Sequence, residues 1–241
     1  MNPEAFKNIK LKRVGSVSPH SSIDYDSNGK VIRSRKPDDI IAEHLPRFEI
    51  DRGLDAVEKM KDESGKFLME IIFDKYRSQG NVAVLDAGCG SGRTLHEIRD
   101  RLTFWAKATP ESVTTVGVND IDYSEESVDP KTRAAIKNGE IPYTVDDLAI
   151  VKLPAQAFDI VFANEVITRN TIGNAAKIID NLLTTLKLGG VFIFDISEPQ
   201  WENHKLRDYF DGLVNGYKLY GYAEYKERSN DKRIFIAIQP R

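Results

Sequence analysis

The sequence predicts an α/β protein built on a doubly wound, mostly parallel seven-stranded sheet, with helices on both faces and a C-terminal antiparallel hairpin. Three observations lead to this fold class. Short apolar runs alternate with segments of helical periodicity from residue 62 onwards. A glycine-rich turn joins the first of these strands to the next helix. The last two strands, 217–228 and 232–238, are separated only by residues 229–231, so they form a hairpin without a crossover helix.

The composition is that of a globular protein with one large domain. The chain has 241 residues, of which 41% are hydrophobic and 29% charged. No apolar run reaches the roughly 20 residues that a membrane span needs, so we expect no membrane partner. The N-terminus has no apolar secretion core, which predicts an intracellular, cytoplasmic protein. The single cysteine, Cys89, excludes an intrachain disulfide.

The charge is spread unevenly along the chain. Residues 1–36 carry eight Lys/Arg and three acidic residues, a net charge of +5. The remaining residues carry 26 basic and 34 acidic side chains, a net charge of −8. A basic leader of this kind either binds nucleic acid or another anion, or is simply solvated and mobile. Both interpretations stay open at this point.

Two local patterns stand in the N-terminal part. Asn28-Gly29 predicts a two-residue hairpin turn, and Pro37 to Leu45 predicts a short helix that Pro46 ends. We interpret residues 1–61 as a leader that serves as a lid or a substrate-side appendage. Residues 62–241 form the main domain.

The elements of this domain follow in order. A helix over 62–78 places Phe67, Leu68, Ile71 and Ile72 on one face, and Gly80 ends it. Strands are expected at 82–86, 113–118, 143–145, 158–163 and 191–196, and further helices from the glycine turn to 107 and at 130–138, 175–188 and 201–214. Asp129 caps the helix that begins at Pro130. Leu186 points inward from helix 175–188, which Gly189-Gly190 closes.

The glycine-rich turn, DAGCGSG at residues 86–92, is the most informative stretch. Gly88 can adopt backbone angles that other residues cannot, and Gly90 and Gly92 leave the backbone bare for a ligand. Unpaired N–H groups at the start of the next helix would face an anionic or polar ligand group. The spacing GxGxG differs from the dinucleotide fingerprint GxGxxG. The alternative is a tight turn in some other α/β protein.

DAGCGSG after an apolar strand resembles the first motif of the class I S-adenosylmethionine-dependent methyltransferases. FDIVFANEVI, residues 158–167, resembles the fourth motif of this family, and the closing hairpin is similar to the family's last strands. The resemblance covers about residues 62–241. It implies S-adenosylmethionine as cofactor and transfer of its methyl group to a nucleophile.

The resemblance also implies a set of cofactor-binding residues at the carboxyl ends of the strands, where ligands of doubly wound sheets lie. Asp86, Gly88, Gly90 and Gly92 would line the methionine portion. Asn119 stands where the family has an acid for the ribose hydroxyls, so either Asn119 or the adjacent Asp120 takes that role, with a slight preference for Asp120. Asp146 or Asp147 would meet the adenine amino group, Leu148 would pack on the ring, and Asn164 would stand beside the cofactor. The alternative for each acid is a solvated loop charge.

The catalytic residues are not predicted. Glu165, His204 and His44 are weak candidates for a general base, His96 is assigned a structural role, and a base is needed only if the nucleophile starts protonated. No metal-ligand spacing is present, so no metal is expected. Trp201, Tyr209 and Phe210 either wall a substrate or form the inner face of their helix, which we favour.

The methyl acceptor is predicted to be a small molecule. Asn164-Glu165-Val166-Ile167 lacks the Asn-Pro-Pro-aromatic tetrad of enzymes that methylate amino groups of nucleic acids. Two alternatives remain. One is a methyltransferase acting on RNA, which the basic leader would bind, or on protein, and the other is a non-catalytic S-adenosylmethionine-binding protein.

Overall fold

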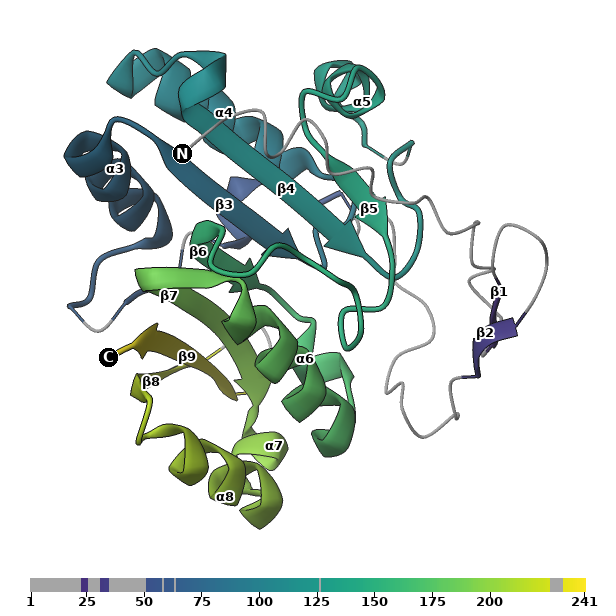
Figure 1. Ribbon diagram of the computed structural model, residues 1–241, viewed down its shortest axis with the longest axis vertical. Helices are drawn as coiled ribbons and strands as arrows, with labels where there is room; N and C mark the ends of the chain where they lie inside the picture. Colours follow the sequence, from purple (N-terminus) through teal and green to yellow (C-terminus); the bar gives the residue numbers. More distant parts are fainter. Residues whose placement is uncertain are drawn as a thin grey trace.

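A seven-stranded sheet forms the centre of the molecule (Figure 1). The computed structural model describes residues 23–25, 31–34, 51–225 except 58, 63 and 126, and 232–241. The strand order is β5-β4-β3-β6-β7-β9-β8. The strands are β3 (Val82–Ala87), β4 (Val113–Asn119), β5 (Tyr143–Val145), β6 (Phe158–Ala163), β7 (Leu186–Ser197), β8 (Tyr217–Tyr225) and β9 (Lys232–Pro240).

The pairing confirms the predicted fold class. β3 to β7 are parallel, whereas β9 is antiparallel to both β7 and β8 and lies between them. The helices are α3 (Leu68–Gln79), α4 (Arg93–Ala106), α5 (Pro130–Lys137), α6 (Ile172–Thr184), α7 (Glu198–Glu202) and α8 (His204–Leu213), with single turns η2 (Leu54–Ala56), η3 (Pro110–Ser112) and η4 (Ile167–Arg169). None of the described helices is long and apolar enough to cross a bilayer.

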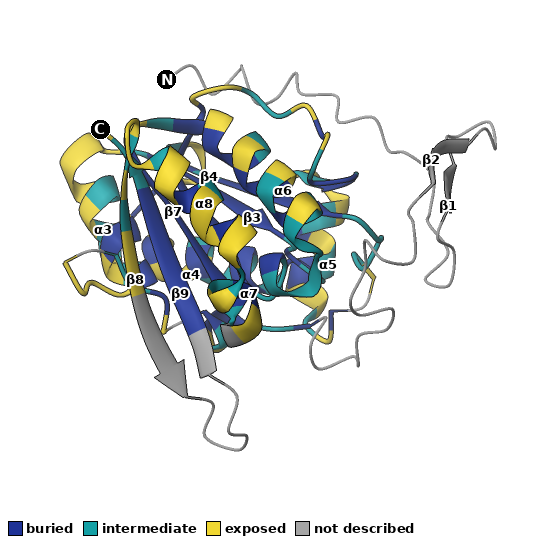
Figure 2. Cartoon of the chain, turned by 90° about the horizontal axis from the view of Figure 1, so that it is seen from below, coloured by how far each residue is buried: buried dark blue, intermediate teal, exposed yellow. Residues whose placement is uncertain are grey.

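Two apolar layers cover the sheet, one on each face. Successive side chains of a strand point to opposite faces, so Val82 and Val84 pack with α3 and α4, whereas Ala83 and Leu85 pack with α6 and α8. Figure 2 shows α6 and α8 with exposed outer turns beside the buried strands β7 and β9. The two layers leave the carboxyl ends of β3 to β7 at one edge, where the site is expected.

Several boundaries differ from the prediction. α3 begins at Leu68 rather than 62, because Lys61 and Phe67 form an antiparallel bridge, and Phe67 is 44% exposed instead of inward. Leu186 begins β7 instead of lying in the helix, and Gly189-Gly190 lies within β7 beside an irregularity in its pairing with β6. The predicted helix 201–214 is split into α7 and α8 at Asn203, whose side chain caps α8.

The part of the chain before α3 is described in two pieces. β1 (Ile23–Tyr25) pairs antiparallel with β2 (Val31–Ser34), in agreement with the predicted hairpin. The Asn28-Gly29 turn, the helix over 37–45 and the turn 229–231 lie outside the described residues. Leu54, Val57 and Met60 are buried in the layer that contains α3 and α4. The leader's role as a lid or substrate-side appendage stays a prediction.

Candidate functional site

The glycine turn connects the end of β3 to the first turn of α4. The N–H of Gly88 donates to the carbonyl of Val118 on β4 at 2.7 Å, which ties the turn to the neighbouring strand. Gly88, Gly90 and Gly92 all have positive φ angles, 84°, 54° and 81°. A Cβ on Gly88 would collide with the side chain of Val166. The turn therefore needs glycine at this position for both its conformation and its space.

Asp86 is a buried carboxylate at this turn. Only 4% of the residue is exposed, and no other described residue donates a hydrogen bond to its carboxylate. Burial raises the pKa of Asp86 to about 8, and the nearby positive charge of Arg52 offsets part of that rise. A buried acid without donors is costly to ionise, so a cationic ligand group would be stabilised beside it.

A small cavity lies against Asp86. Its lining includes Gly88, Gly90, Thr94, Asn164 and Arg52, together with Ala56, Val57 and Cys89. Its volume is about 10 Å³, close to the space of one water molecule. A larger ligand group must therefore displace some of the side chains that line it.

Residues 51–57, which we call the strap, form one wall of this cavity. Asp51 accepts hydrogen bonds from the hydroxyl of Ser91 at 2.6 Å and from the N–H of Val128 at 3.0 Å. Burial acts to raise the pKa of Asp51, but these hydrogen bonds outweigh it and hold the pKa below its usual value. One buried carboxylate thus joins the strap, the glycine turn and the loop before α5.

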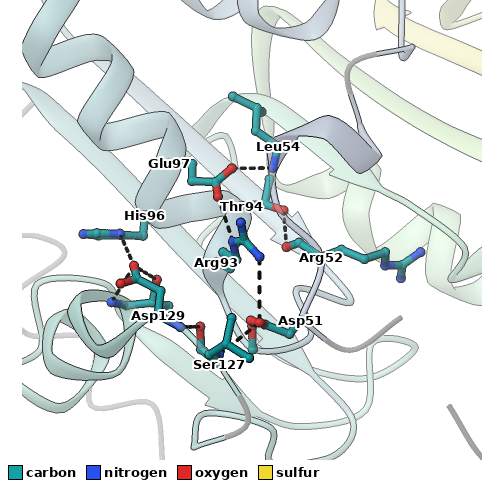
Figure 3. Close-up of polar contacts among 12 residues, drawn as sticks. Asp51, Arg52, Leu54, Arg93, Thr94, His96, Glu97, Ser127 and Asp129 are labelled. Atoms are coloured by element: carbon teal, nitrogen blue, oxygen red, sulfur yellow. Dashed lines mark hydrogen bonds and ion pairs between the residues drawn. The ribbon is translucent and has the colours of Figure 1, made fainter. Parts of the chain in front are cut away.

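Side chains of the first turn of α4 hold the rest of the strap (Figure 3). The hydroxyl of Thr94 donates to the carbonyl of Arg52 at 3.1 Å. Glu97 accepts from the N–H of Leu54 at 2.7 Å and from Nε of Arg93 at 2.8 Å. These contacts fix the backbone on both sides of Arg52.

The side chain of Arg52 reaches across to the end of β6. Its Nη1 lies 3.1 Å from Oε2 of Glu165, and its Nη2 lies 3.5 Å from the carbonyl oxygen of Asn164. The same Oε2 of Glu165 is 2.7 Å from Nη2 of Arg169. The backbone of Glu165 has a φ angle of 59°, and its N–H donates to the buried Asp195. Asn164, only 6% exposed, lines the cavity next to this group.

The structure separates the two candidates after β4. The side-chain nitrogen of Asn119 lies 3.4 Å from both the carbonyl of Gly90 and the hydroxyl of Tyr143, and Tyr143 donates to that carbonyl at 2.7 Å. Asn119 is thus directed at the glycine turn and is 5% exposed. Asp120 follows it outside the strand and is partly exposed.

The acids after β5 also differ in their surroundings. Asp147 is 8% exposed, and its carboxylate accepts from the N–H of Ala149, so it supports the turn that follows. Asp146 is partly exposed, and its N–H donates to the carbonyl of Asn119 at 2.7 Å. Leu148 is 6% exposed and packs in the layer with α6.

A second, larger hollow of about 450 Å³ lies on the β5 side of these residues. It is lined by Asp122, Ser124, Glu125, Arg133, Ile136, Lys137, Tyr143 and Val145. Asp122 and Val145 stand next in sequence to the strand-end residues, so this space adjoins the positions expected for a nucleoside.

The remaining candidates for a base lie apart from the cavity. His96 is on α4, with Nδ1 3.2 Å from the carboxylate of Asp129, the residue that caps α5. His204 is exposed at the start of α8, and His44 lies outside the described residues. Glu165 is the one candidate that contacts a cavity-lining residue, Arg52. The interior placement of Phe210 is confirmed, since it is buried near Trp201 and Phe194.

The sequence analysis did not identify the strap. Asp51 and Arg52 are charged residues in a polar segment without a motif, and their roles depend on contacts with residues 40 or more positions away. The apolar spacing of Leu54, Val57 and Met60 was the available signal that this segment is part of the core.

Comparisons with known proteins agree with the fold. A family model described as a methyltransferase domain matches residues 78–232, more than half of the chain. A malonyl-[acyl-carrier protein] O-methyltransferase from Bacillus cereus is 23% identical over 128 residues, which is 53% of this chain and 42% of that protein. The matched region therefore spans less than half of that relative's length.

Two solved structures have a similar fold. A structure described as a class I S-adenosylmethionine-dependent methyltransferase from Listeria monocytogenes superposes with a TM-score of 0.55 at 14% identity, covering 72% of this chain and 58% of that one. The DszA carbon methyltransferase has a TM-score of 0.51 at 12% identity, covering 71% and 52%. The chain belongs to the methyltransferase-domain family and has the fold of the class I enzymes, whose methyl donor is S-adenosylmethionine.

Proposed function

We propose that this protein is an S-adenosylmethionine-dependent methyltransferase that transfers a methyl group to a nucleophile on a small molecule. One observation carries the proposal. Asp86 is a buried carboxylate without hydrogen-bond donors among the described residues, and it faces a cavity lined by the bare backbone of Gly88 and Gly90. The amino-acid end of S-adenosylmethionine carries an ammonium group, which supplies the charge and the donors that this carboxylate lacks.

The strand-end residues support the placement of the rest of the cofactor. Asp120 is favoured for the ribose hydroxyls, because Asn119 is engaged with the glycine turn. Asp146 is favoured for the adenine amino group, because the carboxylate of Asp147 supports its own turn. Gly92 and Leu148 flank these positions, and Asn164 lines the cavity beside the methionine portion.

When bound, S-adenosylmethionine supplies a methyl group that its sulfonium already activates. The protein's part is to hold the acceptor in line with that methyl and to keep water out, and such positioning accounts for much of the rate. The strap, closed over the cavity through Arg52 and Glu165, excludes solvent from this region. A narrow, covered site of this kind favours a small acceptor that can be enclosed.

Isothermal titration of the full chain with S-adenosylhomocysteine, the demethylated product, tests cofactor binding. We expect saturable binding by the wild-type protein and a loss of affinity of about tenfold or more in Asp86→Asn, because the ligand ammonium loses a charged partner. Asp62→Asn, an acid in the exposed turn before α3, serves as the control and is expected to bind as the wild type does.

A second experiment addresses the acceptor. The enzyme and S-adenosylmethionine are incubated with pools of small metabolites, with RNA and with cell proteins, and the products are searched for the mass of one added methyl group. Methylation confined to RNA or protein would overturn the small-molecule proposal. Binding of the cofactor without any methylated product would favour the non-catalytic alternative.

A further inference from the structure

We infer that Arg52 binds the carboxylate of the ligand's amino-acid end, opposite Asp86, and thereby makes the site selective for ligands that keep a complete amino-acid tail. The inference rests on the proposed function, which it extends to a residue outside the predicted cofactor-binding set. Arg52 and Asp86 line the same cavity and interact through their charges. An α-amino acid carries one positive and one negative group on the same carbon, so a cavity with one fixed acid and one fixed base matches it.

Arg52 has the donors that this role requires. A guanidinium has five N–H donors in a planar fork, and two of them can bind one carboxylate together. Among the described residues, Arg52 contacts only Oε2 of Glu165, at 3.1 Å, and the carbonyl of Asn164, at 3.5 Å, the outer limit of a hydrogen bond. The contact with Asn164 is thus the weaker one, and a ligand carboxylate would replace it at little cost.

The charge of Glu165 remains compensated if Arg52 turns toward a ligand. Oε2 of Glu165 is 2.7 Å from Arg169, closer than it is to Arg52. Arg169 can therefore hold Glu165 while Arg52 moves. The cavity of about 10 Å³ is bounded by Arg52, so a rotation of this side chain is the smallest change that makes room for the tail.

The strap holds the backbone of Arg52 in place. Thr94 binds its carbonyl, Asp51 anchors the preceding residue to Ser91, and Glu97 binds the N–H of Leu54. Arg93, the neighbouring cation, is occupied by Glu97 at 2.8 Å. Arg52 is therefore the guanidinium that the fold presents to the cavity beside Asp86.

The test measures ligand selectivity rather than activity. Binding of S-adenosylhomocysteine is compared with binding of its decarboxylated analogue, using the full-length wild type, Arg52→Gln, Arg52→Lys and the matched control Arg169→Gln. We expect Arg52→Gln to lose about tenfold to hundredfold in affinity for S-adenosylhomocysteine and almost none for the analogue. Arg52→Lys keeps the charge but not the planar fork, so its preference should be intermediate. Arg169→Gln removes a cation from the same acid and should keep the preference of the wild type.

The outcomes separate the inference from the function on which it rests. If the wild type binds neither ligand, the proposed function fails. If the wild type binds both equally, or Arg52→Gln loses both to the same degree, Arg52 only holds the strap and the inference is overturned. Should Arg52→Gln fail to fold, the preference of the wild type and of Arg52→Lys decides, because an unchanged preference in the lysine variant would also overturn it.

Discussion

Asp86 sets the pH dependence of the site at the scale of a single residue. Its pKa is about 8 in the folded chain, against an ordinary value of 3.8. Between these two values the folded protein binds a proton that the unfolded chain has lost, so stability falls as pH rises through this range. A bound ammonium group opposes this penalty, since it favours the ionised carboxylate. Stability without ligand and affinity for ligand are therefore expected to change in opposite directions with pH.

Asp86→Asn tests this linkage. The variant cannot ionise at this position, so the loss of unfolding free energy between about pH 5 and about pH 8 should shrink by about 1–3 kcal/mol relative to the wild type. Urea denaturation at the two pH values measures the difference. Asp55→Asn, an exposed acid on the strap, is the control and should behave as the wild type. A wild type whose stability is flat across this range would contradict the assignment.

The same residue predicts how cofactor binding varies with pH. Only the ionised carboxylate attracts an ammonium, so the affinity of the wild type for S-adenosylhomocysteine should rise from about pH 6.5 to about pH 8.5. In Asp86→Asn the rise should disappear. Titration calorimetry at several pH values provides the measurement, and an equal rise in both proteins would show that another group titrates.

At the scale of elements, the strap depends on a shared carboxylate. Asp51 joins it to Ser91 of the glycine turn and to Val128 before α5. Asp51→Ala and Ser91→Ala should each lower the free energy of unfolding by about 1–3 kcal/mol, because each leaves a buried partner unpaired. The double variant should lose less than the sum, with a coupling of at least about 0.5 kcal/mol.

A distant pair supplies the control for this cycle. Thr184 lies at the end of α6, which covers the opposite face of the sheet, and its hydroxyl bonds within that helix. Thr184→Ala and Asp51→Ala should therefore be additive in urea denaturation. Additivity between Asp51 and Ser91 would show that the strap and the glycine turn are energetically independent.

β4 supports the glycine turn through a missing side chain. A Cβ on Gly117 would lie 2.6 Å from the sulfur of Cys89 and 3.0 Å from Leu95. Gly117→Ala should cost about 1–3 kcal/mol of stability through this overpacking. Gly173→Ala on α6 is the matched control, since its Cβ would meet nothing within 4 Å and alanine favours helices. Equal stability of the two variants would contradict the packing described here.

The regular elements were predictable where one periodicity dominates. Strands 143–145 and 158–163 coincide with β5 and β6, and Asp129 accepts the N–H groups of Lys131 and Thr132 as a cap, because these signals lie within a few residues. Leu186 was assigned to the wrong element because it continues the spacing of α6. Its place in β7 depends on pairing with Phe158, a contact that no local pattern contains.

At the scale of the whole molecule, Cys89 reports on global unfolding. It is the only cysteine, is 6% exposed, and burial raises the pKa of its thiol. Iodoacetamide should therefore modify it only when the domain opens, and S-adenosylhomocysteine should slow the reaction by stabilising the folded state. Mass spectrometry follows the modification. A rate equal to that of an unfolded thiol without denaturant would contradict this burial.

The whole fold was predictable from the order of its elements, but the closure of the site was not. Alternating strands and helices define the sheet, and its carboxyl edge then locates Asp86, Asp120, Asp146 and Asn164. Arg52 reaches that edge through a contact with a residue 113 positions later in the chain, Glu165. Such a contact arises from packing of the complete domain, and neither charge nor spacing near residue 52 indicates it.

The position of β9 between β7 and β8 has a consequence for biosynthesis. As the ribosome releases the polypeptide from its N-terminus, β8 emerges before the strand that links it to the sheet. The edge of β7 must therefore wait, with its backbone groups open to water or to another nascent chain, until β9 arrives. A stretch of synthesis thus exists in which chaperones have the greatest opportunity to act on this protein.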